Sequence, residues 1–483
     1  MHCNEQRVRT DKLLRVLLSV PMQRADKRGL PINAVEALND AGLGYIAAAC
    51  KQAGIDVTLF GWNVDYDLQT FRAKLLEWRP DVVGLKVFTT DFRAARDTLS
   101  CVREVLPGAI TVIGGPHPST SRPEDIFAEF GGLLDFAIAG DGEQGIAELL
   151  GLIAAAGGKP TAAAVAHVPG LVYTNEGKAH ANAPRLDANL DGLAPMDWSL
   201  QQPQWFGTAH GLDNASLGAL IMDSRGCPGR CAFCLCGRIN GAAPRRLGLG
   251  RLCAEIEKLV TSYGVRSLVF TGNSFMSDVE YVRELCRWLI SRRLGVQWSC
   301  TGSYYVRHLK EKGMLPLMRA AGCSLIYFGI ESGNPDVRKR LTQPTTLEEI
   351  AEIVRLTTET GIRARGYFMF GFPDETVQEM DDTIRFAFSL PFDRIGFAVC
   401  LPLPGTLSYY AVLRQRSIER IDWGRYDFRR PKLLPCKATP WQVQLKIMQT
   451  RILKKSGFVR RLYGLVQGEP GDASTGAQMR QQD

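Results

Sequence analysis

The sequence lacks an apolar run long enough to span a bilayer, and its first residues do not form a signal peptide. Thirteen cysteines without a secretory signal indicate reduced thiols, so we expect the protein in the cytoplasm. Charge of neither sign dominates, because 58 Lys and Arg residues oppose 50 Asp and Glu residues and the basic ones are scattered along the chain. A membrane protein, a disulfide-stabilised secreted protein and a nucleic-acid-binding protein are therefore disfavoured.

Two cofactor signatures are also missing. The first predicted strand is not followed by the pattern G-x-G-x-x-G, which disfavours a nicotinamide or flavin cofactor. None of the six His residues has an Asp two positions before it, so the pattern D-x-H-x-x-G is absent as well. At 483 residues the chain is too long for a single core, and we expect two or three domains.

Three thiols on one loop, Cys227, Cys231 and Cys234, have the spacing C-x3-C-x2-C. An apolar run over residues 217–223 predicts a strand that leads into this loop. Three thiolates on a tight loop can hold three irons of a [4Fe–4S] cluster and leave the fourth iron open to a small molecule. A structural zinc site would need two well-separated ligand pairs, which the loop does not offer. Cys236 lies too close to Cys234 to join the same cluster, and we expect a free thiol there.

From residue 213 the chain alternates strands and helices. This alternation predicts a partial (β/α)6 barrel over residues 213–407, open on one side, with its site at the carboxyl ends of the strands. The predicted strands span residues 219–223, 267–271, 296–300, 325–330, 366–370 and 395–401, and one of the predicted helices between them spans residues 308–321.

The cysteine spacing, with Phe233 just before the third Cys, resembles the radical S-adenosylmethionine (radical SAM) superfamily. The loops that follow the predicted strands occur in the order that this superfamily has. The resemblance implies a [4Fe–4S] cluster held by the three Cys and S-adenosylmethionine bound at the open iron, with Phe233 beside the cofactors.

The same resemblance implies where S-adenosylmethionine binds. Gly272 and Asn273 would receive its amino group, although Asn273 stands where an acid is often found. Glu331 and Ser332 would meet the ribose hydroxyls or the ammonium group. Gly371 lies in the segment that borders the adenine, whose aromatic residues would equally suit a plain core.

The first 155 residues predict a doubly wound, Rossmann-like parallel sheet, because short apolar runs alternate with amphipathic helices. Ligands are expected at the carboxyl ends of its strands, where Thr89, the turn Gly114–Thr120 and the segment Gly140–Glu143 stand. Small residues there let a bulky ligand approach the backbone. The predicted strands span residues 15–21, 56–60, 81–88, 109–114 and 134–139, and the helix predicted after the second strand spans residues 68–78.

Segments around Gly42, Asp81, Gly114 and Gly140 resemble the cobalamin-binding domain found upstream of many radical SAM barrels. Without D-x-H-x-x-G, the resemblance implies cobalamin held without a His ligand, with a histidine near its tail or corrin edge. The alternatives are that His117 is a turn residue that caps the backbone, or that the domain is a flavodoxin-like scaffold without cobalamin. The residues implied to contact cobalamin are Thr89, Gly114, Gly115, His117, Gly140 and Glu143.

Three further segments complete the chain. Residues 156–212, rich in Ala, Gly and Pro, predict a linker with a short hairpin strand near Val168–Tyr173. Residues 408–466 predict a helical extension, and the polar residues 467–483 predict a disordered tail.

Together these resemblances imply a cobalamin-dependent radical SAM methyltransferase that cleaves S-adenosylmethionine reductively and C-methylates a small molecule or natural-product intermediate. Oxidative cyclisation or ring rearrangement, as in the anaerobic porphyrin cyclases, would use the same cofactors, since a fold does not fix the reaction. A non-catalytic cobalamin or cluster sensor would usually carry an output domain, and none is apparent. We expect a flavodoxin- or ferredoxin-type electron donor, and neither nucleic acid nor a membrane as partner.

Overall fold

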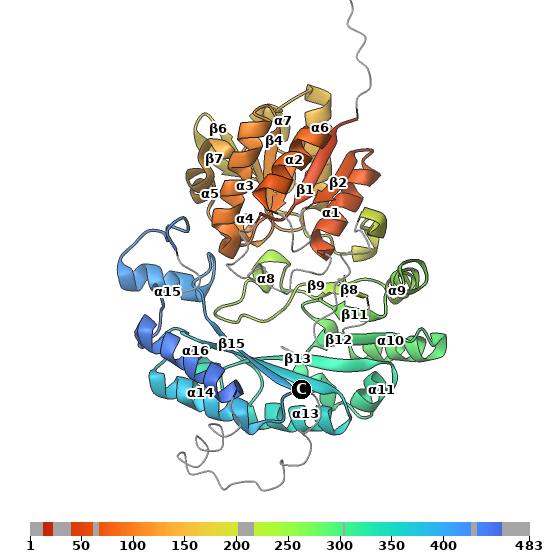
Figure 1. Cartoon of the computed structure of the whole chain (residues 1–483), viewed down its shortest axis with the longest axis vertical. Coiled ribbons are helices and arrows are strands. Elements are labelled where there is room, and N and C mark those ends of the chain that lie inside the picture. The colour runs from red at the N-terminus through yellow and green to blue at the C-terminus, as the bar shows by residue number, and fades with distance from the viewer. Residues whose placement is uncertain are drawn as a thin grey trace, which may run out of the picture.

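The computed structural model describes residues 13–22, 40–60, 67–200, 217–302, 305–426 and 432–455. Figure 1 shows two sheet domains stacked along the long axis, the first coloured red to yellow and the second green to blue. Both domains consist of helices and largely parallel sheets, so the predicted fold class is confirmed. The tail predicted at 467–483 lies outside the described residues.

The first domain is built on a seven-stranded sheet with the order β2-β1-β3-β4-β5-β6-β7. Its first five strands are parallel, and β6 and β7 continue the sheet in antiparallel fashion beside β5. Only the first strand of this hairpin was predicted, within a linker, whereas the structure places both strands in the sheet of the first domain. The strands are β1 (Arg15–Ser19), β2 (Asp56–Phe60), β3 (Val82–Lys86), β4 (Ile110–Gly114), β5 (Phe136–Ile138), β6 (Leu171–Asn175) and β7 (Lys178–Ala181).

Helices cover both faces of this sheet, because its central strands are apolar on both sides. In β1, for example, Val16 and Leu18 pack into one core and Leu17 packs into the other. The sheet is therefore doubly wound, as predicted. The covering helices are α1 (Ala41–Gln52) and α6 (Glu143–Ala156) on one face and α2 (Leu68–Trp78), α3 (Phe92–Val105) and α5 (Pro123–Phe130) on the other.

The second domain is a partial barrel of six parallel strands with the order β15-β14-β13-β12-β11-β8. β8 and β15 form its two edges, so the barrel is open on one side, as predicted. The strands are β8 (Gly218–Ile221), β11 (Ser267–Phe270), β12 (Gln297–Thr301), β13 (Cys323–Glu331), β14 (Arg363–Phe370) and β15 (Arg394–Val399). The long helices outside them are α9 (Leu249–Tyr263), α10 (Val279–Arg292), α13 (Leu347–Glu359) and α14 (Val377–Ser389).

Some elements differ from the sequence prediction. The helix expected over His308–Ala321 is divided, because Gly313 takes a left-handed φ of 71° between a 3-10 turn and α11 (Met314–Ala320). The 14-residue helix α6 was not predicted. Neither were four short helices of at most six residues, which are too short to show an apolar period: α4 (Pro116–Thr120), α7 (Ala162–Val165), α8 (Cys236–Ile239) and α12 (Pro335–Arg340). The helix α15 (Leu407–Arg416) lies in the segment that was predicted as a helical extension.

Segments on either side of the barrel join the two domains. Before β8, Leu190 and Trp198 pack into the core of the second domain. After β15, Tyr409 and Trp423 pack into the core of the first domain, on the side of α3. The last described helix, α16 (Pro440–Lys455), returns to the barrel and packs on α14.

A group of buried charges lies where the two domains meet. The Arg225 guanidinium, just before the cysteine loop, contacts Asp141 at 3.1 Å and donates two hydrogen bonds to Glu143. Arg245 donates to the second Asp141 oxygen at 2.6 Å, and the ring of Tyr45 lies 5.8 Å from the Arg225 guanidinium carbon. The chain that follows β5 is therefore attached to the entrance of the barrel.

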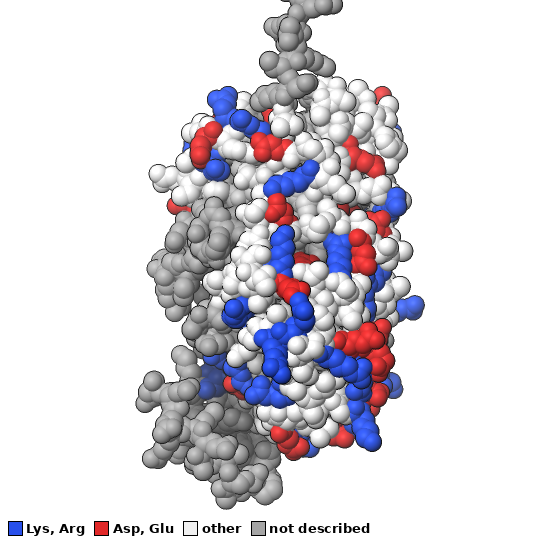
Figure 2. Space-filling model, turned by 90° about the vertical axis from the view of Figure 1, so that its right-hand side faces the viewer, with Lys and Arg blue, Asp and Glu red and all other residues white. Residues whose placement is uncertain are grey.

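No helix among the described residues is long and apolar enough to cross a membrane. Figure 2 shows one face of the molecule, on which Lys and Arg side chains gather over the lower half with Asp and Glu side chains beside them. Charges of both signs are thus interspersed on this face.

The junction predicts an unequal response to single and double substitutions. Arg225→Met should lower the free energy of unfolding by about 3–5 kcal/mol, because it leaves a buried Glu143 carboxylate without its partner. The double variant Arg225→Met with Glu143→Gln should recover part of the lost free energy of unfolding. Urea unfolding of both single variants and the double variant measures the coupling.

Arg292 offers a matched control, because its pair with Glu257 is on the surface. Arg292→Met should change the free energy of unfolding by only about 0–1 kcal/mol. Equal losses at Arg225 and Arg292 would contradict a buried junction.

Candidate functional site

The cysteine loop begins just past the end of β8. β9 (Ser224–Arg225) pairs with β10 (Arg245–Arg246), and Gly226 then turns the chain with a φ of 91°. A Cβ at Gly226 would lie 2.3 Å from the carbonyl oxygen of Ala243, so only glycine fits this turn. The short ribbon therefore fixes the direction in which the loop leaves the sheet.

The three thiols of the loop differ in exposure. Cys227 and Cys231 are half-buried and Cys234 is exposed. The Gly229 N–H lies 3.4 Å from the Cys227 sulfur, and the Cys236 N–H lies 3.5 Å from the Cys234 sulfur. Hydrogen bonding from Cys236 lowers the pKa of Cys234, which favours the thiolate that binds iron.

Within the described ranges, no three His, Cys, Asp or Glu side chains are grouped to hold a metal ion. The thiolates of a four-iron cluster bind three different irons, so they stand farther apart than the ligands of a single ion. The spacing of three thiols on one loop therefore suits a cluster better than a single zinc ion.

Loops at the carboxyl ends of other barrel strands hold the cysteine loop. After β11, the Ser274 hydroxyl donates to the carbonyl of Gly226 at 2.7 Å. Beyond β13, the Thr342 hydroxyl donates to the carbonyl of Arg230 at 3.0 Å. The path of the cysteine loop is thus set by contacts far away in the sequence.

Segments that follow β14 and β15 also contact the cysteine loop. The ring of Phe233 packs 5.5 Å from the ring of Phe372, which follows β14. The backbone N–H of Leu407, after β15, donates to the carbonyl of Ala232 at 2.9 Å. Phe233 packs against a small apolar cluster of Ala232, Val337, Leu341, Phe372 and Cys400.

Asp223 joins the cysteine loop to the segment after β11. Its fully buried carboxylate accepts hydrogen bonds from the Gly272 N–H at 2.9 Å and the Ser224 hydroxyl at 2.8 Å. A Cβ on Gly272 would lie 2.2 Å from the Ser224 hydroxyl oxygen, so a side chain cannot be accommodated there. Burial raises the pKa of Asp223. Asn273, the next residue after Gly272, is half-buried.

Glu331 ends β13 in an uncommon backbone conformation, with a φ of 69°. The register between β13 and β14 shifts between Gly329 and Glu331, and such an irregularity re-aims a side chain. Burial, with the nearby Cys234, raises the pKa of Glu331 to about 8. The neighbouring Ser332 is fully buried, and its hydroxyl lies 3.1 Å from that of Thr383, inside the protein.

A buried carboxyl also holds the loop after β14. Glu375 accepts hydrogen bonds from the Gly371 N–H at 2.6 Å and the Phe372 N–H at 3.1 Å. Burial raises the pKa of Glu375 to about 8. Gly371 has a φ of 93°, which favours glycine.

At the carboxyl ends of the strands of the first domain, Gly114, Gly115 and Gly140 form a cradle of backbone without side chains. A Cβ at Gly114 would meet no atom closer than 3.9 Å, whereas at Gly115, with a φ of 93°, it would lie 3.2 Å from the backbone of Val87. The Ser119 hydroxyl donates to the Gly115 carbonyl at 2.7 Å and accepts from the Gly140 N–H at 3.0 Å. A Cβ at Gly140 would lie 2.8 Å from the side chain of Pro184. Of the three glycines of this cradle, only Gly114 therefore leaves open space beside the main chain, where a ligand can approach it.

His117 and Thr89 lie behind this cradle. The fully buried His117 ring has Nδ1 3.1 Å from the Thr89 hydroxyl and Nε2 3.1 Å from a Glu129 carboxylate oxygen. It also packs against Phe92, with ring centroids 5.7 Å apart. Both ring nitrogens therefore have side-chain partners in the protein, and the histidine attaches α4 to α5.

The cradle and the cysteine loop face each other across the domain junction. α4, which follows Gly115, packs against α8, which follows Cys234 (Figure 1). The carboxylate of Glu143, at the same edge of the first domain, is engaged by Arg225. The structure thus brings the two predicted cofactor regions together.

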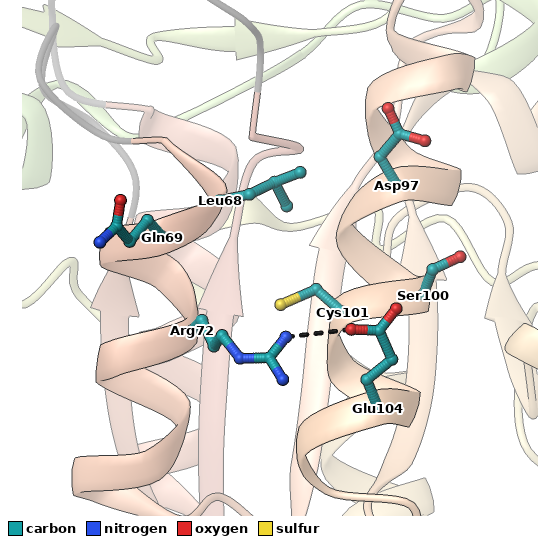
Figure 3. Close-up of a pocket in the computed structure, with 7 residues that line it drawn as sticks. All are labelled: Leu68, Gln69, Arg72, Asp97, Ser100, Cys101 and Glu104. Carbon is teal, nitrogen blue, oxygen red and sulfur yellow. Dashed lines mark hydrogen bonds and ion pairs between the residues drawn. The ribbon is translucent and has the colours of Figure 1, made fainter.

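A separate groove of about 390 Å³ opens between α2 and α3 (Figure 3). Arg72 donates to Glu104 across it at 3.0 Å. None of its lining residues is among the predicted site residues, so this groove does not identify the site. They are Leu68, Gln69, Arg72, Asp97, Ser100, Cys101 and Glu104.

Three polar side chains that position the loops were not identified from the sequence: Asp223, Gln343 and Glu375. The Gln343 amide donates to the Cys231 sulfur at 3.1 Å. A carboxylate directly beside a strand end or a glycine turn could have indicated Asp223 and Glu375. No local pattern indicates Gln343, because its contact spans 112 residues.

Comparison with known families agrees with the two-domain structure. The model of the B12 binding domain matches residues 29–150, and the model of the radical SAM superfamily matches residues 221–387. The two matches follow the same order as the cradle and the cysteine loop.

Individual relatives match most of the chain. A protein of Pyrococcus horikoshii named as an uncharacterized methyltransferase is 25% identical over 477 residues, 94% of this chain and 98% of that one. The anaerobic magnesium-protoporphyrin IX monomethyl ester cyclase of Rubrivivax gelatinosus is 27% identical over 403 residues, 82% of this chain and 70% of the cyclase.

A solved structure shares the fold. It is that of OxsB, a cobalamin-dependent S-adenosylmethionine radical enzyme with aqua-cobalamin and S-adenosylmethionine bound, with a TM-score of 0.72 and 16% identity. The match covers 96% of this chain and 69% of OxsB. The chain therefore belongs to the cobalamin-binding radical SAM enzymes, whose cofactors are a [4Fe–4S] cluster, S-adenosylmethionine and cobalamin.

Proposed function

We propose that this enzyme methylates a carbon atom of a small-molecule or natural-product substrate. The observation that carries the proposal is the cradle of the first domain facing the cysteine loop of the barrel across one junction. When bound, the cluster supplies the electron that cleaves S-adenosylmethionine reductively, and cobalamin supplies a methyl group. Because the two cofactor sites face each other, one substrate can reach both cofactors.

On this proposal Cys227, Cys231 and Cys234 hold three irons of the cluster. Asp223 fixes the Gly272 backbone by its hydrogen bond, so that main-chain groups beside it can receive the amino group of S-adenosylmethionine. The ring of Phe233, packed on Phe372, keeps water from the loop.

Two further regions have proposed binding roles. Glu331 accepts hydrogen bonds from the ribose or the ammonium group of S-adenosylmethionine, while the buried hydroxyl of Ser332 supports its loop from behind. Asn273 completes the amino-group site, and the turn at Gly371 borders the adenine.

Cobalamin lies on the backbone cradle of the first domain in this proposal, at Gly114, Gly115 and Gly140. Thr89 and His117 support the cradle from behind, since the Thr89 hydroxyl and the His117 ring are hydrogen-bonded to each other. Glu143 contributes by holding the junction through Arg225.

Cyclisation is the second candidate, because the cyclase of Rubrivivax gelatinosus is a relative over most of this chain. Methylation is favoured because the relative named as a methyltransferase matches almost the full length of both chains. We further propose a flavodoxin- or ferredoxin-type donor, since reductive cleavage needs single electrons. Every described cysteine is a free thiol, which supports a reducing compartment such as the cytoplasm.

The cluster assignment predicts different outcomes for two cysteines of one loop. Anaerobically purified wild-type protein should contain about four iron and one cobalt per chain. Cys231→Ala should lose nearly all iron and all formation of 5′-deoxyadenosine, while its cobalt content stays unchanged. Cys236→Ala is the matched control and should keep the iron. A Cys231→Ala protein with full iron content would contradict the assignment of Cys231 as a ligand of the cluster.

Methyl transfer can be distinguished from cyclisation without the substrate. Reduced enzyme with bound cobalamin, given S-adenosylmethionine alone, should form about one S-adenosylhomocysteine per cobalt, because the methyl group must first reach the cofactor. Protein prepared without cobalamin should form none. Production of 5′-deoxyadenosine with no S-adenosylhomocysteine would favour cyclisation instead.

A further inference from the structure

The Cys231 thiol receives a side-chain hydrogen bond from outside the cysteine loop. The Gln343 amide nitrogen lies 3.1 Å from the Cys231 sulfur. The backbone N–H groups of Gly229 and Cys236 lie farther from the sulfurs of Cys227 and Cys234, at 3.4 and 3.5 Å. The side chains of Ser274 and Cys236 also form hydrogen bonds with these two sulfurs. Gln343 lies three residues beyond the end of α12, so its contact with the loop is a tertiary one.

The position of Gln343 is fixed by its surroundings. Its backbone N–H donates to the Arg338 carbonyl at 3.0 Å. The preceding residue, Thr342, has a φ of 56°, and its hydroxyl donates to the Arg230 carbonyl at 3.0 Å. A residue without glycine's freedom holds such a backbone only where several contacts impose it.

The buried side chain of Arg338 holds the backbone of this turn. Arg338 is 4% exposed, and its guanidinium donates to the carbonyls of Ile330 at 2.5 Å and Thr345 at 2.7 Å. These bonds attach the turn to the end of β13. These contacts together fix the backbone that presents the Gln343 amide to the Cys231 sulfur.

We propose that Gln343 is a positioning residue that raises the reduction potential of the cluster through its hydrogen bond to Cys231. The inference rests on the proposed role of Cys231 as a cluster ligand. Reduction adds negative charge to the cluster and its sulfurs, and an N–H donor stabilises that charge. Hydrogen bonds to the sulfurs are one of the means by which a protein sets the potential of an iron–sulfur cluster.

The test is the midpoint potential of the cluster, followed by electron paramagnetic resonance in anaerobic protein. Gln343→Leu removes the donor and should lower the potential while the iron content stays at about four per chain. Gln343→Lys keeps an N–H donor and should leave the potential at or above that of the wild type. Gln378→Leu, at an exposed glutamine on α14, is the matched control and should not change it.

Gln343→Met keeps the length of the side chain and gives the same comparison if the Leu variant binds less iron. A midpoint potential equal to the wild type in a Leu or Met variant that holds its full iron would overturn the role of Gln343. A wild-type protein without iron, or a Cys231→Ala variant that keeps it, would instead overturn the cluster assignment. The two failures are therefore distinguishable.

Discussion

The buried ion pairs of Arg225 with Asp141 and Glu143 are the contact on which the arrangement of the two domains depends. Taking such charges out of water costs several kcal/mol per ion, so each group must keep its partner. Arg225 lies two residues before Cys227, and the acidic partners follow β5 of the first domain. The position of the backbone cradle of the first domain and the path of the cysteine loop are thus determined by the same contacts.

The cysteine loop has little conformational freedom of its own. It is held by hydrogen bonds from Ser274 and Thr342 and by the N–H of Leu407, each at the carboxyl-terminal side of a different strand. A partial barrel brings these segments to one mouth because all of its strands run in the same direction. The rigid sheet therefore places the loops, and the loops place the thiols.

Regular elements could be predicted from the sequence, because apolar periodicity reports local burial. The strand Asp56–Phe60 and the helix Leu68–Trp78 were predicted with the bounds that the structure has. The partners of buried polar groups could not be predicted, since they are set by tertiary contacts. His117 was interpreted as a turn residue or a cofactor contact, but its ring lies between Thr89 and Glu129.

Two buried carboxyls with similar pKa values illustrate why geometry must accompany electrostatics. Burial raises the pKa of both Glu331 and Glu375 to about 8. Glu375 accepts two backbone N–H groups and so stabilises a turn. Glu331 ends a strand at the barrel mouth beside the exposed Cys234, where a cationic ligand would favour its ionised form.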